Sequence, residues 1–296
     1  MMREFEYQRC DVFTRKPLEG NQLAVFTDAE GLTDGEMQAI AREMNLSETT
    51  FVLRRDEETE RRRGVGVRIF TTQEELPFAG HPTLGTATVI RQTPAGYANA
   101  ERIVLDLNAG QVAVSFAESQ AAGDAVFGEM AQRDPLFGAT HEAAAIAPVL
   151  GLRVDDFAEI APETVSTGLS FCIVLVRSVE ALGRLRLDLV ASERYVKDSD
   201  AKFFYVLAPE GDEWRARMQF YNGEDPATGS AAGCAISYLV KHGLCAGGQR
   251  VHLRQGIEMG RPSDLYLSAN VVDGKVGEVR VGGSTVRVAK GRFFLA

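Results

Sequence analysis

The chain has 296 residues, of which 45% are hydrophobic and 25% are charged, the balance of an ordinary soluble globular protein. At ~150 residues per domain, this length favours two domains. The formal net charge of −9 and the pI near 5.1 argue against nucleic acid or an anionic membrane as a partner.

The N-terminal sequence and the cysteines predict a cytoplasmic protein. The first residues, Met-Met-Arg-Glu-Phe-Glu-Tyr, lack the apolar core of a signal peptide, and no apolar run reaches the ~18 residues that a membrane span needs. Cys10, Cys172, Cys234 and Cys245 are scattered without metal-site spacing. We therefore expect reduced thiols and no bound metal.

Strand patterns dominate the first half. The predicted strands are residues 4–13, 23–26, 50–53, 65–70, 103–107 and 112–116, the last two forming a hairpin around Asn108-Ala109-Gly110. Thr33 and Glu36 predict a capping box at the start of an amphipathic helix. Arg61-Arg62-Arg63 follows an acidic stretch, and we interpret it as a charged loop.

The second half repeats this style. Its predicted strands are residues 171–176, 203–207 and 214–221, with further short strands between 251 and 294, and its helical regions are 141–150 and a broken segment at 178–196. Two other segments, 83–91 and 231–241, are small and apolar nearly all round, which is typical of helices buried on every side. Gly243 is expected to end the second of these helices.

The two halves contain related segments. One runs from Arg68-Ile-Phe-Thr to Gly80, and the other from Arg217-Met-Gln-Phe to Gly229. The two arginines lie 149 residues apart, as do the two glycines and the prolines of the two Pro-x-x-Gly sequences. The repeat predicts an α+β protein of two similar lobes, each a sheet around a central buried helix, with residues 117–135 as the crossover. We expect the site to lie between the lobes.

Each repeat places a helix start where it could bind an anion. Pro82 is favoured at a first helical position, which makes His81 the expected N-cap, and Ser230 is the expected N-cap of the second helix. Free backbone N–H groups near Gly80 and Gly229 would then hold a carboxylate. The alternative is two ordinary helix caps.

Two acids are candidates for proton transfer. Glu48 lies between the amphipathic helix and an apolar strand, and Asp225 directly precedes the second buried helix. Partial burial would raise the pKa of either carboxyl and suit it to acid–base chemistry near neutral pH. The alternative is a strand-edge surface acid and a loop acid. No phosphate-binding loop, dinucleotide motif or Gly-x-Ser-x-Gly sequence is present.

Motifs along nearly the whole chain resemble those of the PhzF family, which is named after an isomerase of phenazine biosynthesis. The matching segments are Asp11-Val-Phe-Thr, Gly20-Asn-Gln-Leu-Ala-Val-Phe26, Asn45-Leu-Ser-Glu-Thr-Thr-Phe51, Arg68-Ile-Phe-Thr, Glu75-Leu-Pro-Phe-Ala-Gly-His-Pro-Thr-Leu-Gly-Thr-Ala87, Thr167-Gly168, Glu224-Asp-Pro-Ala-Thr-Gly-Ser-Ala231 and Gln255-Gly-Ile-Glu-Met-Gly-Arg-Pro262.

This resemblance implies a diaminopimelate-epimerase-like fold, in which each lobe is a twisted mixed sheet around its central helix. We expect residues 1–120 to form the first lobe and 121–285 the second, and the C-terminal strand, about 286–296, can return to the first. A homodimer is usual for the family. The residues that the resemblance assigns are Glu48, His81 and Asp225 as catalytic, and Gly80, Gly229 and Ser230 as substrate-binding.

The implied reaction is a cofactor-independent isomerisation of a small carboxylate-bearing substrate, with Glu48 removing and returning a proton. Where diaminopimelate epimerases have two cysteines, this chain has Ala79 and Thr228, which disfavours a two-thiol racemase. Two alternatives stay open. One is an epimerase or dehydratase of a small hydroxy or amino acid, and the other is a protein-binding member with a vestigial site.

Overall fold

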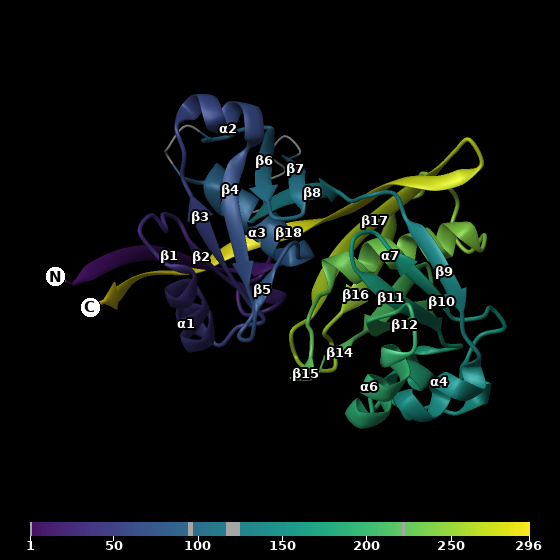
Figure 1. Ribbon diagram of the computed structural model, residues 1–296. Helices are drawn as coiled ribbons and strands as arrows, with labels where there is room; N and C mark the ends of the chain where they lie inside the picture. The colour runs from purple at the N-terminus through teal and green to yellow at the C-terminus, as the bar shows by residue number, and fades with distance from the viewer. Residues whose placement is uncertain (1, 94–96, 117–124, 221–222) are drawn as a thin grey trace. The chain divides into compact units, whose positions relative to one another are not determined.

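The computed structural model describes residues 2–93, 97–116, 125–220 and 223–296 (Figure 1). It is an α+β structure, a mixed sheet with helices packed against it, as predicted. The chain forms two compact units: unit 1 is Met1–Ala131 with Gly282–Ala296, and unit 2 is Gln132–Val281. Residues 117–124, which include the expected lobe boundary and part of the expected crossover, lie outside the described residues.

Unit 1 is built around one buried helix. Its elements are β1 (Arg3–Val12), β2 (Asn21–Phe26), α1 (Asp34–Met44), β3 (Glu48–Leu53), α2 (Glu57–Arg63), β4 (Val65–Phe70), β5 (Glu75–Leu76), α3 (Gly80–Arg91), β6 (Arg102–Leu107), β7 (Gly110–Phe116), β8 (Val126–Ala131) and the end of β18 (Lys275–Leu295).

The strands of unit 1 form a closed, barrel-like ring. Their order is β1-β2-β3-β4-β6-β7-β8, and β18 lies next to both β8 and β1. Helix α3 contacts strands on several sides of this ring, and its residues from Gly80 to Ile90 are all buried (Figure 1). The small, apolar character of this segment is what allows a helix to be enclosed in this way.

Unit 2 contains the second buried helix. Its elements are β9 (Leu136–Thr140), α4 (Ala143–Leu150), a 3₁₀ turn (Val154–Asp156), β10 (Glu163–Ser166), β11 (Ser170–Leu175), α5 (Val179–Gly183), α6 (Leu189–Lys197), β12 (Phe203–Glu210), β13 (Glu213–Arg217), β14 (Gln219–Phe220), β15 (Gly223–Glu224), α7 (Gly229–Lys241), β16 (Val251–Gln255), β17 (Ser263–Val272) and the start of β18.

The main sheet of unit 2 is covered by helices. Its order is β17-β16-β13-β12-β11-β10-β9, with the start of β18 beside β17. Phe204 and Val206 of β12 pack in a core with α4, α5 and α6. Because side chains alternate along a strand, Tyr205 of β12 faces the other way. Helix α7 packs against β10, β11, β12 and β17, and its residues from Gly229 to Val240 are buried (Figure 1).

Local sequence signals explain how Glu48 is placed. The predicted capping box is present, since the side chain of Thr33 accepts from the backbone N–H of Glu36 and the Glu36 carboxylate returns the contact. Helix α1 ends at Met44, and Asn45 takes the left-handed conformation, with φ of 50°, that closes a helix C-terminus. The chain then enters β3 at Glu48, parallel to β2 and antiparallel to β4.

Several predicted elements need correction. The prediction of a charged loop at residues 61–63 is wrong, because these arginines end helix α2. The side chain of its N-cap, Asp56, accepts from the backbone N–H of Thr59. Its acidic first turn and basic last turn suit the helix dipole. The short strands predicted after residue 251 are also wrong in length, because β17 has 10 residues and β18 has 21. The single strand predicted at residues 214–221 is wrong, because the chain forms β13 and β14 there, in two different sheets, and residue 221 lies outside the described residues.

Other predictions are confirmed. The hairpin of β6 and β7 pairs from Arg102 with Ser115 to Leu107 with Gly110. The broken helical segment is α5 followed by α6. Gly243 has a φ of 70° just after the end of α7. In the described residues, no helix is both long and apolar enough to cross a membrane.

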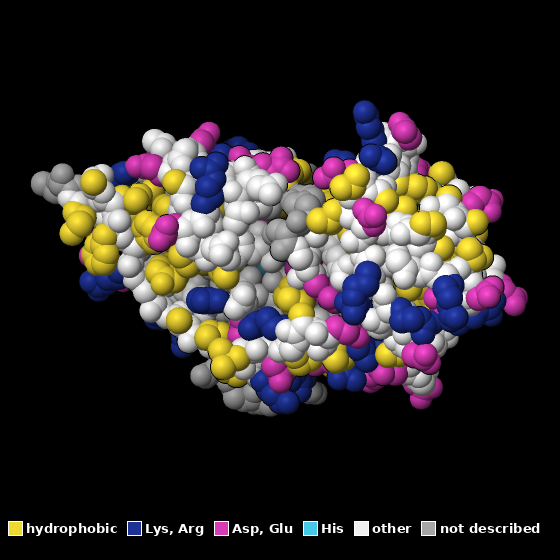
Figure 2. Space-filling model, turned by 90° about the horizontal axis from the view of Figure 1, so that it is seen from below, with side chains coloured by type: hydrophobic (Ala, Val, Ile, Leu, Met, Phe, Trp, Pro, Cys, Tyr) yellow, Lys and Arg dark blue, Asp and Glu magenta, His cyan; other side chains and the backbone are white. Residues whose placement is uncertain are grey.

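The face shown in Figure 2 carries acidic and basic side chains side by side rather than in separate fields. A protein that binds nucleic acid through its surface charge needs a basic patch or stripe. The face in this view has no broad surface of that kind.

Candidate active site

Three chain segments of unit 1 bring Asn21, Glu48 and His81 together. Asn21 begins β2, Glu48 begins β3 opposite Leu23 of β2, and His81 lies in the first turn of α3. His81 Nε2 lies 3.4 Å from Glu48 Oε2, and Asn21 Nδ2 lies 3.1 Å from His81 Nδ1. Two of the sequence-predicted catalytic residues therefore meet within unit 1.

The imidazole of His81 is almost fully enclosed, with 5% of its side chain exposed, whereas 16% of the Glu48 side chain is exposed. Burial lowers the pKa of His81 to about 3, although a hydrogen bond to the backbone of Gln22 opposes this shift. The ring is therefore neutral near pH 7. Among the described residues, its buried Nε2 atom makes no hydrogen bond, and Glu48 Oε2 lies 3.4 Å away.

The neighbours of His81 Nδ1 leave the position of the ring proton open. The amide of Asn21 donates to an unprotonated Nδ1, whereas a contact with the Gln22 carbonyl suits a protonated one. In one tautomer Nε2 presents a proton toward Glu48, and in the other it presents a lone pair. At Nε2 the neutral ring can therefore donate a hydrogen bond in one tautomer and accept one in the other.

Both helix starts differ from the sequence prediction in the same way. Helix α3 begins at Gly80 with Ala79 as N-cap, and α7 begins at Gly229 with Thr228 as N-cap; neither cap side chain bonds the helix. The assignments of His81 and Ser230 as N-caps are therefore wrong, and both are second helical residues. Proline fits in the third position of α3 because first-turn N–H groups have no acceptor within the helix.

Asp225 of unit 2 is buried and held by a side-chain network. Only 6% of the residue is exposed. Thr228 Oγ1 donates to Asp225 Oδ2 at 2.6 Å, and Gln255 Nε2 donates to both Thr228 Oγ1 and the Asp225 carbonyl, at 3.0 and 2.8 Å. Ser230 is also buried and is the second residue of α7, four positions after Pro226.

Each repeat contains a bidentate arginine–glutamate pair that sequence reasoning missed. Arg68 donates to both oxygens of Glu75 at 2.7 and 2.6 Å, and Arg217 donates to both oxygens of Glu224 at 2.8 and 2.6 Å. Both pairs span seven residues and occupy corresponding positions of the repeat. The pairs tie the strand before each helix start to the segment that leads into the helix.

The thiols are buried and protonated. All four cysteines are free and buried, and burial raises the pKa of Cys234, in α7, to about 12. A thiolate is the reactive form, so no cysteine of this protein is poised for acid–base work. Within the described ranges, no group of three or more His, Cys, Asp or Glu side chains is arranged to hold a metal ion.

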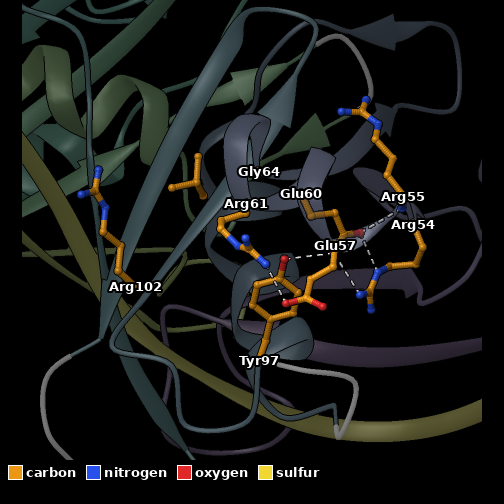
Figure 3. Close-up of a pocket in the computed structure, with 9 residues that line it drawn as sticks. Arg54, Arg55, Glu57, Glu60, Arg61, Gly64, Tyr97 and Arg102 are labelled. Carbon is orange, nitrogen blue, oxygen red and sulfur yellow. Dashed lines mark hydrogen bonds and ion pairs between the residues drawn. The ribbon is translucent and has the colours of Figure 1, made fainter.

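A separate cavity of about 610 Å³ lies in unit 1, between α2 and β6, and neither Glu48 nor His81 lines it (Figure 3). Its charged walls largely satisfy one another: Arg54 binds both oxygens of Glu60, and Arg61 binds Glu57. Tyr97 donates to Glu60 across the cavity floor. None of the residues assigned to the site lines it.

Comparison with known proteins places the chain in a family. The family model of phenazine biosynthesis-like proteins, PhzC-PhzF, matches residues 10–291. The chain belongs to the PhzF family. A trans-2,3-dihydro-3-hydroxyanthranilate isomerase from Pseudomonas aeruginosa is 37% identical over 292 residues, which cover 98% of this chain and 99% of that protein.

Solved structures agree. A predicted epimerase from Pseudomonas aeruginosa is 37% identical, with a TM-score of 0.85 over 99% of this chain and 100% of its own. A PhzF-family phenazine biosynthesis protein from Bacillus anthracis, 23% identical, has the same fold, with a TM-score of 0.86 over 99% of this chain and 100% of its own. This chain is an isomerase of the PhzF type, as its motifs predicted.

Proposed function

We propose that this PhzF-type isomerase moves a proton within a small carboxylate-bearing substrate, without a cofactor, and that Glu48 is the general acid and base. The observation that carries the proposal is the approach of Glu48 Oε2 to His81 Nε2 at 3.4 Å, with His81 buried and neutral. Glu48 would take a proton from one carbon of the substrate and return one to another carbon. Overall composition and oxidation state are unchanged in such a step.

The environment of this pair suits that division of work. Because the ring of His81 is neutral near pH 7, it supplies no fixed positive charge and can hold a substrate group by a hydrogen bond at Nε2. Glu48 is the more exposed of the two and so the better placed to meet a substrate. We propose His81 as the residue that orients the substrate and relays protons, and Asp225 as the third catalytic residue.

The two helix starts supply the proposed carboxylate-binding groups. Gly80 and His81 are the first two residues of α3, and Gly229 and Ser230 are the first two of α7. Their backbone N–H groups have no acceptor within the helix, and a helix N-terminus favours negative charge. We propose that they bind the substrate carboxylate and stabilise enolate-like charge in the transition state.

The similarity to the Pseudomonas aeruginosa isomerase makes trans-2,3-dihydro-3-hydroxyanthranilate the first substrate to test. We further propose two similar lobes related by the sequence repeat, a diaminopimelate-epimerase-like fold, a homodimer and a cytoplasmic location. The shared Gly starts and matched arginine–glutamate pairs support the repeat. Light scattering on the purified protein tests the dimer.

Epimerisation is the second candidate, because one solved relative at 37% identity is described as a predicted epimerase. A two-thiol epimerase is disfavoured here by Ala79 and Thr228 at the cysteine positions and by the high pKa of the buried Cys234. A one-base epimerase on Glu48 would use the same geometry, and it differs from an isomerase in the carbon that receives the proton.

Turnover in deuterated water separates these reactions. The protein is incubated with trans-2,3-dihydro-3-hydroxyanthranilate, and the products are followed by NMR and mass spectrometry, with heat-denatured protein as the control. The proposal predicts a double-bond isomer carrying solvent deuterium at the newly protonated carbon. Recovered substrate with inverted configuration would establish an epimerase instead. Loss of water from the substrate would establish a dehydratase. An unchanged compound would show that it is not a substrate of this protein.

A further inference from the structure

The amide of Gln255 has its orientation fixed by backbone groups. Its Oε1 atom accepts from the backbone N–H of Thr228 at 3.1 Å, and its Nε2 atom donates to the backbone carbonyl of Asp225 at 2.8 Å. A backbone N–H only donates and a carbonyl only accepts, so these contacts assign the oxygen and nitrogen of the amide without ambiguity.

The second lone pair of Oε1 and the second hydrogen of Nε2 also make hydrogen bonds. Tyr205 donates its hydroxyl to Gln255 Oε1 at 2.8 Å, and desolvation raises the pKa of Tyr205 well above its usual range, which keeps that proton in place. The second hydrogen on Nε2 goes to Thr228 Oγ1 at 3.0 Å. Both lone pairs and both hydrogens of the amide are therefore engaged in a site that is fully buried.

Gly256 permits this close approach. It has a φ of 75°, which favours glycine, and a Cβ at this position would lie 2.6 Å from the carbonyl oxygen of Pro226. Any side chain here would push Gln255 away from the segment that carries Asp225. The end of β16 is therefore shaped to hold the Gln255 amide against residues 225–228.

Because Gln255 Nε2 can only donate, Thr228 Oγ1 must accept from it, and the hydroxyl proton of Thr228 points to Asp225 Oδ2 at 2.6 Å. Oδ2 is thus held as an acceptor. We infer that Gln255, acting through Thr228, is a positioning residue that directs the Thr228 hydroxyl proton to Asp225 Oδ2 and so fixes the orientation of the Asp225 carboxyl. Its importance for turnover rests on the proposed function, in which Asp225 takes part in proton transfer.

The Thr228 hydroxyl donates to the Asp225 carboxyl, and loss of such a hydrogen bond raises the pKa of a carboxyl group. Among the described residues, the titratable groups near the network include Tyr205 on β12 and Cys234 on α7, and the Arg217–Glu224 pair leads into Asp225. Tyr205 and Cys234 stay neutral near pH 7, since burial raises the pKa of each. The Thr228 hydroxyl donates directly to Asp225 Oδ2, so its removal tests the network.

The test is an NMR titration of the Asp225 carboxyl in protein labelled with ¹³C at the aspartate carboxyl carbon, assigned with Asp225→Asn. Thr228→Val is nearly isosteric but has no hydroxyl, and Thr228→Ser keeps the donor as the matched control. We expect the pKa of Asp225 to rise by about one unit or more in Thr228→Val and to stay near the wild-type value in Thr228→Ser. Equal values in all three proteins would overturn the inference.

Gln255→Glu provides a second, independent variant. An ionised glutamate at this position accepts the Thr228 hydroxyl instead of donating to it, so Asp225 should again titrate at higher pH, and Gln255→Met, which removes the donor without adding a charge, is the control for repulsion between the two carboxylates. An unchanged Asp225 pKa in a folded Gln255→Glu protein would contradict a directed network. The titration needs no substrate and so decides the inference even if the proposed isomerisation fails. A shift by NMR without a matching shift in the pH profile of kcat would remove Asp225 from catalysis instead.

Discussion

At the start of α3, His81 faces Glu48 and its ring proton is fixed by no single neighbour, whereas at the start of α7 every proton between Tyr205 and Asp225 has an assigned direction. Both starts share a glycine, a Pro-x-x-Gly sequence and a bidentate arginine–glutamate pair. One repeated framework therefore supports two kinds of proton environment. At the first start the position of the ring proton is open, and at the second the Thr228 hydroxyl proton is directed to Asp225.

The arginine–glutamate pairs test the shared framework, and they carry the largest expected effect on stability. The Arg217 side chain is 4% exposed and also donates to the Leu182 carbonyl, whereas that of Arg68 is 19% exposed. Arg217→Met should lower the free energy of unfolding by about 3–5 kcal/mol, because it leaves Glu224 without its counter-charge in a largely buried position.

Arg68→Met should lower the free energy of unfolding by only about 1 kcal/mol, because its pair is better solvated. Arg61→Met is the control, since both members of its pair with Glu57 are exposed. Urea denaturation of the three variants measures the differences. Equal losses for Arg217→Met and Arg68→Met would mean that burial does not distinguish the two copies.

His81 should make the protein less stable in acid. Its pKa is about 3 in the folded protein and about 6.5 when unfolded, so the unfolded chain binds the extra proton between these values. Stability should therefore fall as the pH falls from about 6.5 toward 3. The loss should be at most about 1.4 kcal/mol per pH unit beyond that of His81→Gln, measured by denaturation at several pH values. Parallel curves would show that His81 is not buried as a neutral ring.

His252 of unit 2 should act with the opposite sign and a smaller amplitude. Its two ring nitrogens lie 2.8 Å from Glu213 and from Asp264, and the hydrogen bond to Asp264, followed by that to Glu213, raises its pKa. Its contribution is complete below the unfolded value of about 6.5 and is lost as the pH rises through the folded value. Comparison of the wild type with His252→Gln from pH 6 to 9 should show this loss, and an unchanged difference would contradict it.

Changes to the cysteine thiols should have the smallest effect, and that effect is on activity. Because Cys234 is buried, with its pKa raised to about 12, a thiol reagent should leave the activity of the folded protein nearly unchanged. Cys234→Ala should likewise retain turnover. Rapid inactivation that Cys234→Ala prevents would indicate a thiol mechanism at the second helix start.

Most elements of the fold were predicted from periodic and repeated patterns in the sequence. The capping box of α1, the β6–β7 hairpin and the two all-round apolar helices follow from short-range rules, and the structure contains each of them. The lengths of β17 and β18 did not follow, because strand ends depend on pairing with distant partners. The α2 helix was missed because its charged sequence has no apolar face.

For the site, the sequence named candidate residues but not the contacts between them. Glu48 and His81 are 33 residues apart in sequence, and only the parallel pairing of β2 with β3 and the burial of α3 bring them together. Asn21 has no local signal that reveals its contact with His81. The arginine–glutamate pairs did have one, since both glutamates follow their arginines by seven residues at the same place in the repeat.

The most direct test of the account is the kinetics of Glu48→Gln. Glutamine keeps the shape of the side chain but cannot take up and return a proton, so kcat should fall at least ~100-fold. Binding of a non-reacting aromatic carboxylate analogue should change little, and Glu43→Gln, an exposed site on α1, should behave like the wild type. Retained turnover in a folded Glu48→Gln protein would contradict proton transfer by this carboxylate.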